Sequence, residues 1–298
     1  MFKKWKRASF LLTLVLIMGV LAACGNDNPN DASSSDGVGA EISGIVTAAG
    51  STALLPLADV AANEFMQKHS DVSVTVQGGG SGTGINQVAN GAVNIGNSDV
   101  PSADKIEDEA LAGQLVDNKV SGIAFGIVVN EDVKVDDLTV EQIQGIFSGK
   151  ITNWKEVGGQ DLEINVINRP ASSGTRITFD KTVMKDVKIN DSIGTNQDSN
   201  GAVENSINST SGSISYLAMS YLVEGKDTSL KIITIDGAEP TAEDVANGSY
   251  PFWSYEYMVT KGEPKGAAKA YIDFLVSEEF AEKVDQMGYI PMVELMDK

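Results

Sequence analysis

Three short segments of the sequence combine glycine with serine or threonine directly before a predicted helix. They read AGSTALLPL, QGGGSGTGINQV and RPASSGTRITF, and they begin at Ala49, Gln77 and Arg169. The first N–H groups of a helix have no acceptor within the helix, and the helix dipole places partial positive charge there. Glycine lets an oxyanion approach the backbone, and a hydroxyl side chain adds a donor. Each segment alone could be a simple N-cap or the start of a catalytic loop, whereas three together favour one shared anion site.

Two charged residues accompany these segments. Arg169 opens the third segment, and its guanidinium offers a fork of N–H donors that fits an oxyanion. Asp99 follows a predicted strand in NIGNSDVPS, at a place where a sheet delivers residues to a cleft. Asp99 could also be a turn or N-cap aspartate ahead of Pro101. The sequence therefore suggests an anion site that contains one arginine and one carboxylate.

The motifs of common catalytic and nucleotide-binding sites are not met. There is no P-loop pattern, and GGGSGTG fits neither G-x-G-x-x-G in register nor the G-x-S-x-G elbow. Ser102–Lys105 matches S-x-x-K without a following K-T-G, and we interpret it as a helix start. His69, the only histidine, ends a predicted helix, and Cys24 is the only cysteine. A zinc site, or a Ser-His-Asp triad on any other histidine, is close to excluded, so we expect no enzyme activity, metal or cofactor.

Short β-like runs alternate with helical segments along the chain from residue 44 onward. Strands are predicted at 44–50, 72–77, 92–99, 122–130, 163–167, 213–217, 231–235 and 252–260. Helices are predicted at 54–69, 82–90, 139–147, 175–184, 202–208, 265–276 and 278–288. This order predicts an α/β fold whose sheets are covered on both faces. The similar halves favour a two-lobed, hinged protein, although periodicity alone also allows one large sheet.

The N-terminus has the layout of a secretory signal. Four basic residues within residues 3–7 precede an apolar run from Phe10 to Ala22, which is shorter than the roughly 20 residues of a membrane span. Leu21-Ala22-Ala23-Cys24 resembles the lipobox of bacterial lipoproteins, so we expect cleavage after residue 23 and a lipid (palmitate) on Cys24. An ordinary signal peptide is the alternative. Residues 24–40 are nearly free of apolar side chains and predict a flexible tether.

The charge of the chain is strongly negative. The formal net charge is −19, and because four of the 22 basic residues lie in the signal, the remaining chain is more acidic still. A field of this sign repels nucleic acid, so we expect no nucleic-acid partner. A hydrophobic content of 42% suffices for one large or two medium domains.

The segments GSTAL, GGGSGTG, NSD and RPASSGT, in this order and at these separations, resemble the phosphate-binding lipoproteins of bacterial high-affinity phosphate ABC transporters. YPFWSYEYMV is similar to the return strand between domains in that family, and the likeness spans Ile42 to Met292. The resemblance implies an α/β, two-lobed periplasmic-binding-protein fold of type II. Each lobe would be a central sheet flanked by helices, and two hinge strands would join the lobes. Lobe I would contain residues 41–125 and 255–298, and lobe II residues 126–254.

The resemblance also implies which residues bind phosphate. One lobe would supply Ser51, Thr52, Ala53, Leu54, Ser81 and Asp99, and the other Arg169, Ser173, Gly174 and Thr175. This chain departs from the family at Pro170-Ala171-Ser172, where some members carry an acidic residue that pairs with the arginine. Arg169 would then find a carboxylate elsewhere or be freer. We expect Arg176 to be a helix-surface or domain-closure residue.

The function implied by the resemblance is that of an extracytoplasmic receptor. It would bind inorganic phosphate between the lobes, remain attached to the membrane through its lipid, and deliver phosphate to the permease subunits of an ABC transporter. Asp99 would accept the P–OH that phosphate keeps at neutral pH, whereas fully ionised sulfate has no proton to donate. The alternatives are another oxyanion (arsenate, sulfate or molybdate), a sensor or adhesin on the same fold, or a phosphate-ester hydrolase.

Overall fold

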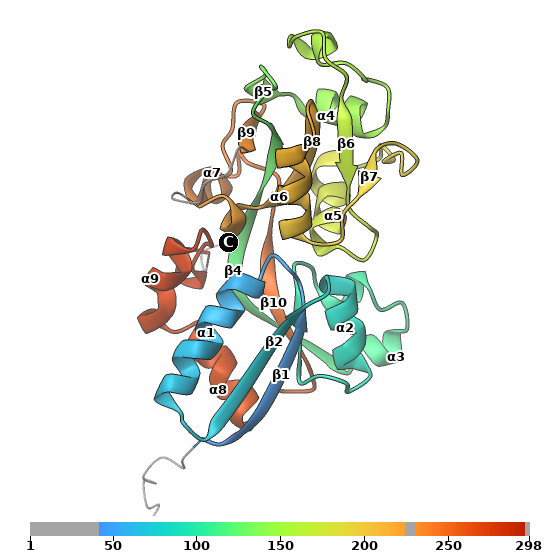
Figure 1. Ribbon diagram of the computed structural model, residues 1–298. Coiled ribbons are helices and arrows are strands. Elements are labelled where there is room, and N and C mark those ends of the chain that lie inside the picture. The colour runs from blue at the N-terminus through green and yellow to red at the C-terminus, as the bar shows by residue number, and fades with distance from the viewer. Residues whose placement is uncertain (1–41, 224–229, 296–298) are drawn as a thin grey trace, which may run out of the picture. The chain divides into compact units, whose positions relative to one another are not determined.

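The N-terminal part of the fold alternates strands and helices as the sequence predicts. The computed structural model describes residues 42–223 and 230–295, so the predicted signal, Cys24 and the tether lie outside the described residues. The elements are β1 (Gly44–Gly50), α1 (Leu55–Lys68), β2 (Val72–Gly78), α2 (Ser81–Ala89), β3 (Ile95–Ser98) and α3 (Glu109–Ala112). β1 lies between β2 and β3 and is parallel to both. Figure 1 shows β1 beside β2. The first two predicted glycine-rich segments therefore begin where the parallel strands β1 and β2 end, at one edge of the sheet.

Two long strands connect the halves of the sheet. β4 (Leu115–Asn130) is antiparallel to β10 (Trp253–Lys261) over its first part, and β10 also pairs with β3. From Phe125 onward the partners of β4 change to β8 (Ser213–Ala218) and β9 (Leu230–Ile235). Among the described residues, the main path of a ten-stranded sheet runs β2-β1-β3-β10-β4-β8-β6-β7. The sheet is thus continuous, yet β4 has different neighbours in its two halves, as expected for two lobes joined by long strands.

The second half repeats the pattern of strands and helices. Its strands include β5 (Asp137–Leu138), β6 (Asn165–Asn168) and β7 (Thr195–Asn196). Its helices include α4 (Val140–Phe147), α5 (Gly174–Phe179), α6 (Asn200–Ser209) and α7 (Ala242–Asn247), and α5 continues as a π-helical turn at Asp180–Met184. The chain then returns through β10 to α8 (Gly266–Leu275) and α9 (Glu278–Gln286). α8 packs against α1 and β1 of the first half, and α9 packs against α8 (Figure 1).

Helices cover both faces of the sheet in each half. In the first half, α1 and α8 pack on one face through buried residues such as Leu57 and Tyr271, while Ile85 and Val88 of α2 pack on the other. In the second half, aromatic side chains pack under α4 and α5, and the rings of Phe179 and Tyr216 stack with centroids 4.2 Å apart. The opposite face there is covered by α6. The predicted α/β class with sheets covered on both faces is confirmed.

The predicted role of His69 agrees with the structure. This residue is the C-cap of α1, and its ring lies 4.5 Å from that of Phe65, so packing and the helix end account for it. Ser102 likewise begins a short 3₁₀ helix. In the part of the chain that the structure describes, no helix is long and apolar enough to cross a membrane.

Candidate functional site

The first glycine-rich segment forms the turn between β1 and α1. Its backbone is fixed to the neighbouring strand because the N–H of Ser51 donates to the carbonyl of Asn97 at 2.8 Å. The Ser51 hydroxyl oxygen accepts hydrogen bonds from the N–H groups of Ala53, at 2.9 Å, and Leu54, at 3.1 Å. The hydroxyl oxygen of Ser51 is therefore the acceptor for the two backbone N–H groups that the family resemblance assigns to phosphate. Ser51 itself is almost fully buried.

The second segment begins α2 and holds the backbone of Asp99. The Ser81 hydroxyl oxygen accepts a hydrogen bond from the N–H of Asp99 at 3.0 Å. α2 can lie against β1 only because residue 84 is glycine: a Cβ there would be 2.5 Å from the carbonyl oxygen of Ala49. The glycines of this segment thus allow close helix–strand packing, and that packing delivers Ser81 to the strand end at Asp99.

The carboxylate of Asp99 joins the first and third segments. Only 2% of this residue is exposed. One carboxylate oxygen accepts a hydrogen bond from the hydroxyl of Ser51, and the other accepts one from the hydroxyl of Thr175 at 2.9 Å. Asp99 is therefore a buried acceptor surrounded by hydroxyl donors and is not simply a turn aspartate.

The third segment comes close enough to touch the other two. Ser173 is the N-cap of α5, and its hydroxyl oxygen accepts from the N–H of Arg176 at 3.3 Å. A Cβ on Gly174 would lie 2.2 Å from the Ser81 hydroxyl oxygen and 2.9 Å from the Asp99 Cβ. Only glycine fits at this position in the arrangement that the structure shows, so Gly174 contributes through the absence of a side chain.

Arg169 supplies the positive charge at the end of β6. It is 1% exposed; its Nε donates to the carbonyl of Gln197 at 2.9 Å and its Nη2 to that of Asp198 at 3.3 Å. Its Nη1 is buried and has no hydrogen-bond partner among the described residues. Burial lowers the pKa of Arg169, while Tyr216 and Asp99 act in the opposite direction. In place of the carboxylate that some family members provide, Arg169 is held by backbone carbonyls.

Arg176 corrects one expectation from the sequence. It is 7% exposed and does not lie on the helix surface. Its Nη1 donates to the carbonyl of Arg169 and to Asp191, both at 2.9 Å, and its Nε pairs with Asp180 at 3.0 Å. The helical pattern of α5 could not reveal this because Arg169 precedes the helix and Asp191 lies well beyond its end. Arg176 supports the backbone of Arg169.

Asn200 is a residue of the site region that sequence reasoning missed. Its side-chain Nδ2 donates to the hydroxyl oxygen of Thr52 at 2.9 Å, and its Oδ1 accepts from the N–H of Ala218 at 3.0 Å. Asn200 is fully buried at the first residue of α6, directly after the N-cap Ser199. The letters SNGA resemble the other segments, with small polar residues before a helix, and this signal could have identified it.

The structure therefore brings most of the predicted residues into one buried cluster. Hydrogen bonds or close approach connect Ser51, Ala53, Leu54, Ser81, Asp99, Gly174 and Thr175. Thr52 follows Ser51 in the chain and accepts a hydrogen bond from Asn200 outside this cluster, and Arg169 interacts with Asp99 through charge. The arrangement offers hydroxyl and guanidinium donors and one carboxylate acceptor. Within the described residues, no group of three or more His, Cys, Asp or Glu could hold a metal ion.

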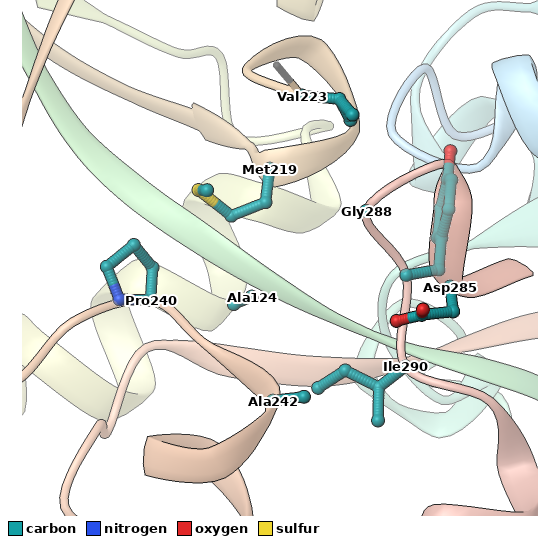
Figure 2. A pocket seen from close by; sticks show the side chains of 9 residues that line it. Ala124, Met219, Val223, Pro240, Ala242, Asp285, Gly288 and Ile290 are labelled. Atoms are coloured by element: carbon teal, nitrogen blue, oxygen red, sulfur yellow. The ribbon is translucent and has the colours of Figure 1, made fainter.

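A separate pocket lies away from these residues. It has a volume of about 170 Å³ and is lined by Met219, Val223 and Pro240 on one side and by residues 285–290 on the other, with Ala124 of β4 between them (Figure 2). Its lining is mainly apolar and includes none of the predicted phosphate-binding residues. It offers no arrangement of donors that would suit an oxyanion.

The comparisons with known proteins place the chain in a family. A family model described as "PBP superfamily domain" matches residues 32–279. The phosphate-binding protein PstS of Bacillus subtilis is 42% identical over 295 residues, which covers 98% of this chain and 96% of that protein. PstS of Borreliella burgdorferi is 29% identical over 254 residues, covering 83% of this chain and 89% of the relative.

Solved structures agree with the sequence relatives. A Clostridium perfringens protein with bound phosphate, assigned as a phosphate ABC transporter substrate-binding protein, has a TM-score of 0.76 at 32% identity, covering 83% of this chain and 99% of its own. An ABC-type phosphate transport receptor from Vibrio cholerae has a TM-score of 0.65 at 30% identity, covering 82% and 99%. The fold and the match to the family model define a protein of the PBP superfamily. Within it, the chain belongs to the family of these phosphate-binding proteins.

Proposed function

We propose that this protein binds inorganic phosphate outside the cytoplasm and delivers it to the permease of an ABC transporter. The observation that carries the proposal is Asp99, a buried carboxylate held among hydroxyl donors beside Arg169, whose Nη1 has no partner among the described residues. The phosphate-binding relatives, which match over nearly the whole chain, support the same ligand. Such relatives are transport proteins, which supports a binding role and not catalysis.

The donors and the acceptor would divide the ligand's oxygen atoms between them. The hydroxyls of Ser51 and Thr175, which donate to Asp99 in the structure, would turn toward the anion. The hydroxyls of Ser81 and Ser173 and the backbone N–H of Gly174 would be further donors. Arg169 would add a charge-assisted hydrogen bond through Nη1. The P–OH of phosphate would then donate to the Asp99 carboxylate. Recognition by hydrogen bonds inside a closed cleft is compatible with an acidic exterior because salt screens surface charge within roughly 8 Å.

Substitution of Asp99 tests the proposal. We expect Asp99→Asn to erode discrimination between phosphate and sulfate, because an amide can donate to the unprotonated sulfate oxygen that a carboxylate repels. An unpaired buried acceptor costs about 1–3 kcal/mol, so the affinity ratio should change by roughly tenfold to a hundredfold. Calorimetric titration with phosphate, sulfate, arsenate and molybdate measures it. An unchanged phosphate-to-sulfate ratio would contradict the role of Asp99, and a preference for arsenate would change the proposed ligand.

The lobe boundaries belong to the same proposal. We infer that residues 41–125 and 255–298 form lobe I and residues 126–254 form lobe II, with the hinge in β4 and β10. This division is supported by the change of β4 from its β10 partner at Ala124 to its β8 partner at Phe125. The predicted phosphate ligands then come from both lobes, and closure around the ligand would create the surface that a permease recognises.

The proposed attachment to the membrane rests on the N-terminal sequence. Residues 1–23 would be removed as a signal peptide, Cys24 would carry the lipid, and residues 24–40 would form the tether. Mass spectrometry of the mature N-terminus checks this directly. A mature chain that begins at another residue, or a Cys24 without lipid, would contradict it.

A further inference from the structure

A second carboxylic acid lies behind Asp99 in the sheet. The register of β10 against β3 pairs Met258 with Asn97 and Tyr257 with Ser98. Asp99 directly follows β3, so one more step of the same register would bring it opposite Glu256, and the charge of Asp99 acts on Glu256. Residues directly opposite each other in antiparallel strands share a face, with Cβ atoms about 4.5–5.5 Å apart. The two acidic side chains are therefore neighbours across the β3–β10 pair.

Glu256 has no route to water and no partner that could neutralise a charge. The residue is 0% exposed, and neither of its carboxyl oxygens has a hydrogen-bond partner among the described residues. On its other side it pairs in register with Ser121 of β4, whose hydroxyl is also buried and without a partner in the described chain. An ionised carboxylate in such surroundings carries a large desolvation cost, whereas a neutral acid does not.

The charged and titratable groups around Glu256 favour the neutral form. Asp99 acts on it from the residue after β3, Tyr289 from the segment after α9, and Tyr257 is its neighbour within β10. None of the ion pairs among the described residues involves Glu256. Arg169 is the nearby cation, and its charge acts on Asp99. Burial first, and the negative charge of Asp99 second, raise the pKa of Glu256 well above its usual range.

We propose that Glu256 is a positioning residue held as a neutral carboxylic acid behind Asp99, so that the cleft presents one negative charge, not two, to a phosphate anion. The inference rests on the proposed role of Asp99 as a ligand contact. If both acids were ionised, the pair would repel the ligand and each other. With the proton on Glu256, Asp99 is the one negative charge left to accept the P–OH, and that charge is balanced by Arg169.

Infrared spectroscopy of the full chain tests the protonation state. At neutral pH ordinary surface carboxylates are ionised, so a C=O stretch from a protonated carboxylic acid stands out. We expect this band in the wild type, its loss in Glu256→Gln, and its retention in Glu263→Gln, a matched change at an exposed glutamate just after β10. Adding inorganic phosphate should shift the band because the ligand contacts the neighbouring Asp99. No band in the wild type, or a band that phosphate leaves unmoved, would overturn the proposal.

Phosphate titration of the same variants gives a second, independent result. Since glutamine reproduces a neutral acid in size and charge, Glu256→Gln should bind phosphate within about threefold of the wild type at neutral pH. A loss of affinity beyond roughly tenfold in a folded Glu256→Gln protein would show that the site needs a charge at this position. The Asp99→Asn variant distinguishes a failure of the proposed phosphate site from a failure of the proposed role of Glu256. If Asp99→Asn leaves phosphate and sulfate binding unchanged, the site assignment fails, whereas an Asp99 effect without the infrared band refutes only the role of Glu256.

Discussion

Asp99 is one acceptor shared by two donors that are far apart in the sequence. Ser51 donates from the turn before α1 and Thr175 from the first turn of α5, so their hydrogen bonds tie two strand–helix junctions to a single side chain. A carboxylate in this position does two tasks. It accepts hydrogen bonds from the hydroxyls of Ser51 and Thr175, and under the proposed function it would select for a ligand that carries a proton.

The pH dependence of stability gives a prediction for Glu256. Its pKa is raised in the folded protein by burial and by Asp99. As the pH rises above the usual glutamate range, the unfolded chain releases this proton while the folded chain keeps it. The free energy of unfolding should therefore fall by about 1.4 kcal/mol per pH unit from this group, until the pH passes the folded-state pKa. Denaturant unfolding at a series of pH values measures this. As the pH rises, the free energy of unfolding of Glu256→Gln should increase steadily relative to that of the wild type.

The control for this prediction is Glu263→Gln, which should follow the wild type at every pH because residue 263 is exposed. A constant difference between Glu256→Gln and the wild type across the pH series would mean that Glu256 titrates alike in the folded and unfolded chains.

The sequence predicted the site residues that lie in recognisable loops but not those that act from within elements. Ser51, Ser81, Asp99 and Thr175 stand beside glycine or at a strand end, where local chemistry is visible in the letters. Glu256 lies inside a strand-like run, FWSYEYMVT, and nothing local indicates that its side chain is buried. That property arises from three neighbouring strands, which a single sequence does not show.

The position of the short helix α5 is fixed by the contacts of one of its side chains. It has only six residues, and Arg176 within it bonds the Arg169 carbonyl, Asp180 and Asp191. The helix, the strand end of β6 and the following loop are therefore held together at one point. Because Ser173, Gly174 and Thr175 precede this arginine directly, its contacts also fix the half of the site that α5 contributes.

Replacing Arg176 with methionine should loosen that half. The change keeps the apolar stem but leaves the Arg169 carbonyl without its donor, and we expect the free energy of unfolding to fall by about 1–3 kcal/mol. Phosphate affinity should fall as well, because the Arg169 backbone is no longer fixed. Lys155→Met, which breaks an exposed pair with Asp161, is the control and should cost less than about 1 kcal/mol. Equal effects of the two variants would refute the supporting role of Arg176.

The boundaries of the elements show why part of the fold escaped prediction. The sequence predicts a strand from Gly122, whereas β4 begins at Leu115. Its first residues include Asp117, Asn118 and Lys119, whose polar side chains resemble a loop when considered alone. They form a strand because β10 supplies hydrogen-bond partners along this stretch. The apolar second part of β4 was predicted because its burial on both faces is visible in the residue types.

On the scale of the whole described chain, direct contacts hold the two proposed lobes together. The N–H of Gly82 donates to the Ser172 carbonyl at 3.0 Å, and Lys105 donates to the Ala171 carbonyl. Asp104 and Lys181 form an ion pair at 2.5 Å between the same two regions. In this arrangement the proposed ligand residues of the two proposed lobes lie together, as the hydrogen bond between Thr175 and Asp99 also shows.

The ion pair between Asp104 and Lys181 should contribute modestly to closure. Lys181→Met should lower phosphate affinity by up to about fivefold at low salt, because exposed pairs contribute about 0.2–1 kcal/mol. The difference from the wild type should shrink at high salt, where such charges are screened. Calorimetric titration at two salt concentrations measures it, with Lys155→Met as a control whose pair lies within lobe II. A salt-independent loss would point to a cause other than this pair.

The burial of the cluster also limits which phosphate compounds the site could accept. Ser51, Ser81, Asp99, Arg169 and Thr175 are each at most 2% exposed, and Gly174 comes so close to Ser81 that even one added carbon would collide. Under the proposed function, such a closed site has no opening through which the organic group of a phosphate ester could extend. Phosphate esters would then have to be cleaved before this protein could bind the phosphate that they carry.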